Sequence, residues 1–109
     1  MTAFQPVFRV VFEIHRRPEL THKQFAERYR RHAPLVRALP GVLRYTQCVV
    51  TGSENLLGPA PDAISILDFD SQDDFRRADE SAEMHAAHAD AASFVSRVAT
   101  YHVDPREVP

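Results

Sequence analysis

Hydrophobic residues follow two kinds of pattern along the chain. Four short segments are rich in β-branched and aromatic residues and are predicted to be strands, at residues 7–15, 42–51, 63–69 and 98–103. Between them, apolar residues recur at spacings of three and four, which is typical of amphipathic helices. The predicted order of elements is therefore β-α-β-β-α-β.

The first helix is predicted to begin after Thr21, which is a good N-cap and forms a capping box with Gln24. One face of this helix comprises residues at spacings of four, three and four, namely Phe25, Tyr29, His32 and Val36. The other face carries Lys23, Glu27, Arg30, Arg31 and Arg37. Pro34 has no N–H and clashes with the carbonyl four residues earlier, so we expect the helix to kink or break beside His32.

The second helix is predicted in two pieces. Ser71 is expected to cap the first piece, and Asp73 and Asp74 suit the dipole of its first turn. A break is expected at 79–81, and a second piece at 82–94. The stripe along that second piece comprises Met84, Ala87, His88, Ala91 and Val95.

This order of elements predicts a single α+β domain spanning residues 1–109, with a ferredoxin-like four-stranded antiparallel sheet and its helices on one face. Apolar residues occupy both parities of three strands, in Val10-Val11-Phe12, Val49-Val50 and Ile66-Leu67. Strands that are apolar on both sides are expected to be buried on both sides. We therefore predict a homodimer through the open sheet face. Leu56 and Leu57, in a loop expected at 52–61, are candidates to cover a pocket mouth or the partner subunit.

Composition narrows the classes of partner. The formal net charge is -2, which gives no reason to expect a nucleic acid or an anionic membrane as partner. A single cysteine allows no internal disulfide and fits a cytoplasmic location. The first ten residues do not have the pattern of a signal peptide, and no apolar run is long enough to span a bilayer.

His32 is the candidate for chemistry that the helical pattern singles out. A titratable ring on an apolar face beside a proline is either a functional group or a core histidine whose nitrogens bond to the backbone. His85 and His88 lie three apart on the second helix, but a third metal ligand at fixed spacing is missing, so no metal site is expected. Motifs for nucleotide binding and for the common hydrolases are also missing, and no cofactor is expected.

Several of these residues carry a resemblance to a known family. The pattern comprises Phe25, Arg28, Tyr29, His32, Pro34, Leu35, Pro40-Gly41 and Tyr45, followed by Asp90, Phe94, Val95 and Arg97. It resembles the EthD-like family of the dimeric α+β barrel superfamily, over about residues 7–103. The resemblance implies a barrel built from the two sheets of a homodimer, with the helices outside.

The resemblance also implies roles for individual residues. His32 matches a histidine of isomerase relatives and would be the general acid or base, and Tyr45 would donate a hydrogen bond to a developing oxyanion. Tyr29 and Gln47 would face the same pocket, and Arg28 would pair with a substrate carboxylate if it leans inward. Cys48 lies on the opposite parity of its strand and is expected to face the barrel.

The resemblance implies two candidate functions. The first is a small cofactor-free isomerase, cyclase or lyase that acts on a cyclic or aromatic carbonyl compound. The second is a non-catalytic ligand-binding or accessory protein of a degradation or biosynthesis pathway. A haem- or quinone-directed monooxygenase is a third and less favoured function. The quinone-oxidising relatives use Trp and Asn in the pocket, whereas this chain has no Trp and its only Asn is Asn55 in the loop. The haem-degrading relatives need an axial histidine, for which His32, His88 or His102 could serve, and the sequence selects none of them.

Overall fold

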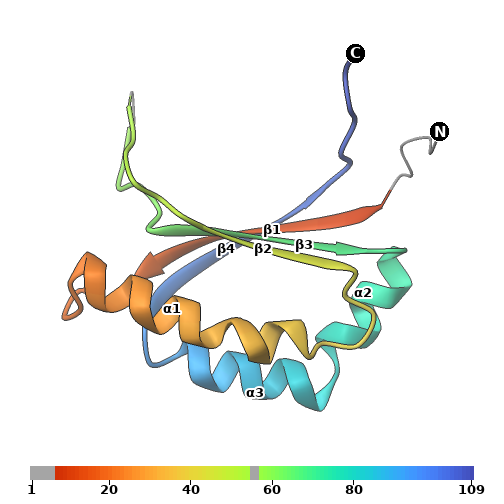
Figure 1. Ribbon diagram of the computed structural model, residues 1–109, viewed down its shortest axis with the longest axis horizontal. Coiled ribbons are helices and arrows are strands. Elements are labelled where there is room, and N and C mark those ends of the chain that lie inside the picture. The colour runs from red at the N-terminus through yellow and green to blue at the C-terminus, as the bar shows by residue number, and fades with distance from the viewer. Residues whose placement is uncertain (1–6, 55–56) are drawn as a thin grey trace.

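The computed structural model describes residues 7–54 and 57–109. Its helices and strands are β1 (Phe8–Arg16), α1 (His22–Arg37), β2 (Arg44–Val49), β3 (Ala63–Phe69), α2 (Gln72–Asp79), α3 (Ala82–Ala91) and β4 (Val95–Val103). The four strands form one antiparallel sheet in the order β2-β3-β1-β4, and the helices lie on one face of it (Figure 1). The predicted ferredoxin-like fold is confirmed.

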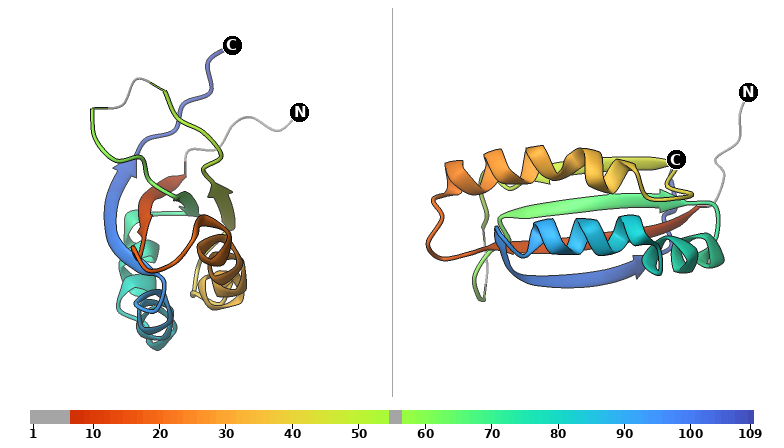
Figure 2. Two further views of the ribbon diagram at one scale, coloured as in Figure 1. Left: turned by 90° about the vertical axis from the view of Figure 1, so that its left-hand side faces the viewer. Right: turned by 90° about the horizontal axis from the view of Figure 1, so that it is seen from below.

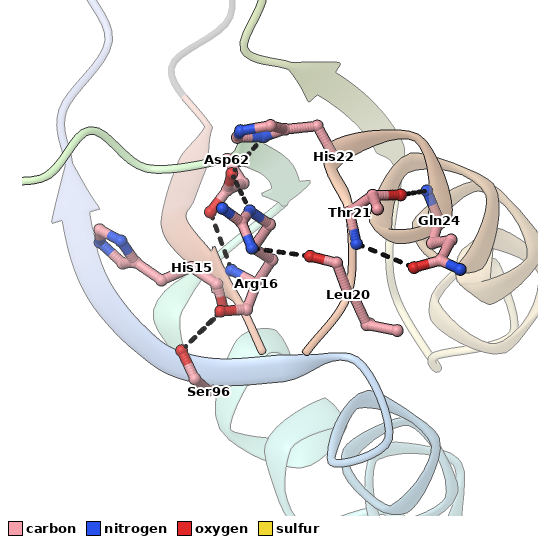
Figure 3. Close-up of polar contacts among 8 residues, drawn as sticks. All are labelled: His15, Arg16, Leu20, Thr21, His22, Gln24, Asp62 and Ser96. Carbon is pink, nitrogen blue, oxygen red and sulfur yellow. Dashed lines mark hydrogen bonds and ion pairs between the residues drawn. The ribbon is translucent and has the colours of Figure 1, made fainter. Parts of the chain in front are cut away.

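Helix α1 begins as the sequence predicts. The Thr21 hydroxyl accepts a hydrogen bond from the backbone N–H of Gln24 at 3.1 Å, and the Gln24 side chain accepts one from the Thr21 N–H at 2.9 Å (Figure 3). The expected break beside His32 is wrong, because the helix continues through Pro34 to Arg37. Pro34 lies in the last turn, where its carbonyl still accepts from the N–H of Ala38, and the buried residues on both sides of it hold the helix on the sheet.

The second helical region divides as predicted, with Ser71 capping α2 and Ser81 capping α3. Its end was predicted too late. Helix α3 ends at Ala91, and β4 begins at Val95 rather than at residue 98. Phe94 is the reason, since its buried ring turns the chain into the core directly after the helix. The predicted second strand was also too long, because β2 spans only Arg44–Val49.

The core lies between the helices and the inner face of the sheet. Helices α1 and α3 run side by side in opposite directions beneath the strands (Figure 2). The side chains on the inner face of β3 are shielded from solvent. Ala63 and Phe69 are fully buried, and Leu67 is 2% exposed. The rings of Phe25 and Phe94 pack together beneath this face, 5.8 Å apart.

The outer face of the sheet is covered by no helix in the described residues (Figure 1). One row across all four strands on that face is Thr46, Ile66, Val11 and Tyr101, in register. A neighbouring row holds Asp68, whose carboxylate accepts two hydrogen bonds from the Arg9 guanidinium, at 2.7 and 3.0 Å. The β2–β3 loop and the C-terminal segment extend from the sheet on this side.

The β2–β3 loop returns to the body of the protein at Asp62. Its carboxylate accepts a hydrogen bond from the backbone N–H of Arg16 at 2.9 Å and lies 3.1 Å from His22 Nδ1 (Figure 3). This contact ties the end of β1 to the start of α1 and so helps to set the position of α1 on the sheet. Of the two loop leucines, Leu56 lies outside the described residues, and Leu57 is fully exposed.

Candidate functional site

A cavity of about 260 Å³ lies between the inner face of the sheet and helices α1 and α3. Most of its wall is apolar, with Phe12, Leu67 and Phe94 among the lining side chains. The polar members of the wall are His32, Tyr45, Ser65, His88 and Thr100. An apolar cavity with a few convergent polar groups is the usual form of a small-molecule site, so this cavity is the candidate functional site.

The exposed part of the cavity wall lies between α3 and β4. The exposed wall residues are His88, Val98 and Thr100, and they belong to these two elements. Val98 leaves 46% of its surface accessible. A small ligand would therefore enter from this side. The predicted stripe from Met84 to Val95 lines the cavity, and His88 is its exposed member.

His32 lies in the cavity wall with only 8% of its surface exposed. Its Nδ1 is 2.8 Å from Asp90 Oδ2, and its ring meets the edge of Phe94 at a centroid distance of 5.2 Å. An ionised carboxylate can only accept a hydrogen bond, so Nδ1 is the protonated nitrogen. In the neutral ring, Nε2 then carries the lone pair, which is the form that a general base requires.

Asp90 reaches His32 from the last turn of the neighbouring helix α3. A carboxylate at the C-terminal end of a helix meets the negative end of the helix dipole, which is an unfavourable place for it. The imidazole of His32 is the compensating partner, because it supplies the N–H that the carboxylate accepts. The side chain of Asp90 is 45% exposed, so this hydrogen bond joins one buried residue and one at the surface.

Tyr45 projects from β2 into the same cavity. Its hydroxyl is 2.8 Å from Gln47 Nε2, and that nitrogen also donates to the backbone carbonyl of Tyr29 at 2.7 Å. An amide NH₂ group has two protons and no acceptor, so Gln47 donates to both oxygens. The proton of the Tyr45 hydroxyl is therefore available for another acceptor. A tyrosine hydroxyl is protonated at neutral pH, and burial raises the pKa of Tyr45 further above that range.

The structure brings together some of the residues that the sequence proposed. His32 and Tyr45 both line the cavity, the first from α1 and the second from β2. Tyr29 and Gln47 do not line it; they lie behind Tyr45 and hold it in place. Arg28 is partly exposed on α1 and is not among the residues that line the cavity, so the condition for its pairing with a substrate carboxylate is not met.

Sequence patterns did not identify two polar residues of the site, which contact the predicted ones. Ser65 is a buried polar residue in the middle of the inner face of β3, and its hydroxyl is 2.7 Å from the Tyr29 hydroxyl. The signal was a serine at the parity of Ala63 and Leu67. Asp90 is part of the family pattern, but its contact with His32 joins residues 58 apart in the sequence, and no local periodicity predicts that.

The described residues include no group of three or more His, Cys, Asp or Glu side chains that is arranged to hold a metal ion. Cys48 lies on the outer face of β2, at the parity opposite to Tyr45. None of the helices in the described part of the chain has the length and apolar run that crossing a bilayer requires.

A four-stranded antiparallel sheet with this strand order, and with helices on one face, defines the ferredoxin-like class of α+β proteins. The EthD domain matches residues 17–97 of this chain, and the chain belongs to the EthD family. A comparison with curated proteins finds no match.

Solved structures of other proteins share this fold. A dimeric ferredoxin-like protein of unknown function from Thermobifida fusca is 20% identical, with a TM-score of 0.72, covering 94% of this chain and 95% of that chain. An EthD family protein from Bacillus halodurans is 22% identical, with a TM-score of 0.71, covering 94% and 99%. A dimeric protein of unknown function from Bacteroides fragilis is 16% identical, with a TM-score of 0.66, covering 93% and 97%. At these identities the likeness shows the fold.

Proposed function

We propose that this protein is a cofactor-independent enzyme of the isomerase, cyclase or lyase type, which acts on a small cyclic or aromatic carbonyl compound. The observation that carries the proposal is the contact between His32 and Asp90 in the wall of an apolar cavity. Asp90 accepts the hydrogen bond of His32 Nδ1 and so sets the tautomer of the ring, and the His32 side chain lines the cavity. This is the arrangement of a general base held by an orienting carboxylate.

In this mechanism His32 Nε2 removes a proton from a carbon next to the carbonyl group. The resulting imidazolium is stabilised by Asp90, which accepts the Nδ1 hydrogen bond throughout. Negative charge develops on the carbonyl oxygen, and Tyr45 donates a hydrogen bond to it. His32 then returns the proton to another atom of the substrate or to a leaving group, which completes an isomerisation, a cyclisation or an elimination.

The test has two steps: a screen for compounds that bind, and a measurement of proton exchange on those compounds. A thermal-shift screen of lactones, aromatic ketones and polyketide-like ketones would select compounds that stabilise the protein. Proton NMR in D₂O would then follow loss of the signal at the carbon next to the carbonyl. We expect enzyme-catalysed exchange that His32→Gln reduces by about 10²-fold or more.

The alternative of a ligand-binding protein without catalysis gives a different result. A compound would then stabilise the wild-type protein and exchange no faster in its presence than in buffer. If His32→Gln instead lowers the melting temperature sharply and leaves exchange unchanged, His32 is a core histidine and the proposal is wrong.

We also propose that two copies associate through the outer sheet face. The row Ile66, Val11 and Tyr101 supplies an apolar strip across three strands, and Tyr101 leaves 47% of its surface exposed in the single chain. Two of the solved structures with this fold are described as dimeric. Sedimentation equilibrium is the direct measurement, and a monomer at micromolar concentration would contradict the proposed association.

A further inference from the structure

Two hydroxyl groups share the sheet side of the cavity. Tyr45 on β2 and Ser65 on β3 both line it, and they occupy diagonal positions on the same face, because Gln47 is the direct partner of Ser65 and Tyr45 that of Leu67. Diagonal neighbours on one face are within reach of an aromatic side chain. The hydroxyls of these two residues therefore form one polar patch in a wall that is otherwise mostly apolar.

The surrounding hydrogen bonds allow both groups to donate to a ligand. Gln47 donates to the Tyr45 oxygen, as shown above. Behind Ser65, the hydroxyl of the fully buried Tyr29 lies 2.7 Å from Ser65 Oγ and donates to the carbonyl of Ile64 at 3.3 Å. Either hydroxyl can be the donor in the contact between Tyr29 and Ser65. When Ser65 turns its proton to a ligand oxygen, Tyr29 can donate to Ser65 Oγ in its place, so the contact between the two hydroxyls is kept.

The described cavity wall holds no permanent positive charge. Neither a lysine nor an arginine is among the residues that line it in the described part of the chain. A permanently charged carboxylate in such a wall would lose its hydration, and it would meet a cation only if His32 or His88 took up a proton. A neutral carbonyl compound carries no such penalty, and its negative charge appears only while His32 holds the proton.

We propose that Tyr45 and Ser65 together bind the carbonyl oxygen of an uncharged substrate, and that Ser65 is a catalytic residue as the second donor to the developing oxyanion. This proposal rests on the proposed function, because His32 is the base. The C–H proton passes to His32 Nε2, the C–H electron pair forms a new C=C bond, and the carbonyl π pair moves to the oxygen. The cavity volume of about 260 Å³ limits such a substrate to one or two small rings.

The test uses 4-nitrophenol as a probe, because its ionised form presents a phenolate oxygen that resembles an enolate and has its own visible absorbance. Wild-type protein, Ser65→Ala, Tyr45→Phe and the double variant are titrated with the probe over a range of pH. Each loss of a donor is expected to weaken phenolate binding roughly ten-fold relative to neutral phenol. The pH at which half of the bound probe is ionised then rises by about one for each variant.

The matched control is Thr46→Val, which removes a hydroxyl from an exposed position on the outer face of β2, away from the cavity, at nearly constant volume. It is expected to leave the ionisation of the bound probe unchanged. If Ser65→Ala does not fold, Ser65→Cys keeps the size of the side chain and replaces the strong donor with a weak one. The proposal is overturned if the probe does not bind to the wild type, or if Ser65→Ala and Thr46→Val give the same result.

A second probe separates this inference from the proposed function. 4-Nitrobenzoate has nearly the size of 4-nitrophenol but stays charged at neutral pH, and we expect it to bind at least ten-fold more weakly than 4-nitrophenol. Equal binding of the two would overturn the uncharged-substrate claim. Loss of proton exchange in His32→Gln, with no effect of Ser65→Ala on either probe, would refute the oxyanion pair and leave the general-base proposal standing.

Discussion

Replacing Asp90 with asparagine tests whether its contact with His32 serves catalysis or stability. The variant keeps the shape of the side chain and removes its charge. The lost contact is a 2.8 Å hydrogen bond between a ring whose side chain is 10% exposed and a carboxylate that is 45% exposed. Pairs with so much solvent access contribute about 1 kcal/mol to the free energy of unfolding.

Part of that loss is offset by the position of Asp90 in the last turn of α3. Removing a negative charge from the C-terminal end of a helix is favourable by about 0.3–0.5 kcal/mol. The net destabilisation of Asp90→Asn is therefore expected to be about 0.5 kcal/mol, which corresponds to a fall in melting temperature of roughly 2–4 °C for a chain of this size.

The effect on proton transfer is expected to be much larger than the effect on stability. Asparagine can offer His32 either an oxygen or an NH₂ group, so the ring is no longer held in the Nδ1-protonated tautomer, and the imidazolium loses its stabilising charge. We expect the exchange rate in D₂O to fall by roughly ten-fold or more. ¹⁵N NMR of labelled histidine measures the tautomer directly in both proteins.

Three results would refute this reasoning. The first is a wild-type ring protonated at Nε2, which would mean that Asp90 does not set the tautomer. The second is a loss of 3 kcal/mol or more in urea unfolding of Asp90→Asn, which would make the pair a structural contact. The third is an equal effect of Asp104→Asn, a control at an exposed position in the C-terminal segment.

Three further predictions concern the core, the pH dependence and the outer face. Phe94→Ala removes a ring that is 1% exposed and is expected to lower the free energy of unfolding by about 3–5 kcal/mol in urea titrations; a loss below 1 kcal/mol would contradict its place in the core. Because the pKa of Tyr45 is raised in the folded state, the unfolded chain binds fewer protons above about pH 10, so stability should fall as the pH rises further, and Tyr45→Phe should show a smaller fall between pH 9 and pH 11. Tyr101→Asp places a charge in the apolar row of the outer face and is expected to weaken the proposed dimer at least ten-fold by sedimentation, whereas an unchanged dimer would exclude that face.

Local patterns determined most of the fold. Thr21, Ser71 and the spacing from Phe25 to Val36 identified both helical regions and the buried face of α1, because capping and helical periodicity act within a few residues. Parity along β2 placed Tyr45 on the side of the helices and Cys48 on the outer face. The errors, at Pro34 and at Phe94, arose where burial outweighed a local preference.

The tertiary structure alone decided how the site is assembled. The sequence placed His32 on a buried face but left open whether its nitrogens met backbone or a functional partner. That question depends on α3 lying beside α1, which brings Asp90 within 2.8 Å across 58 residues of chain. Likewise Tyr29, Gln47 and Ser65 become one hydrogen-bonded group only when α1 packs on β2 and β3. Periodicity fixes the direction of each side chain from its own element, whereas the distance between two elements is set by the packing of the whole core.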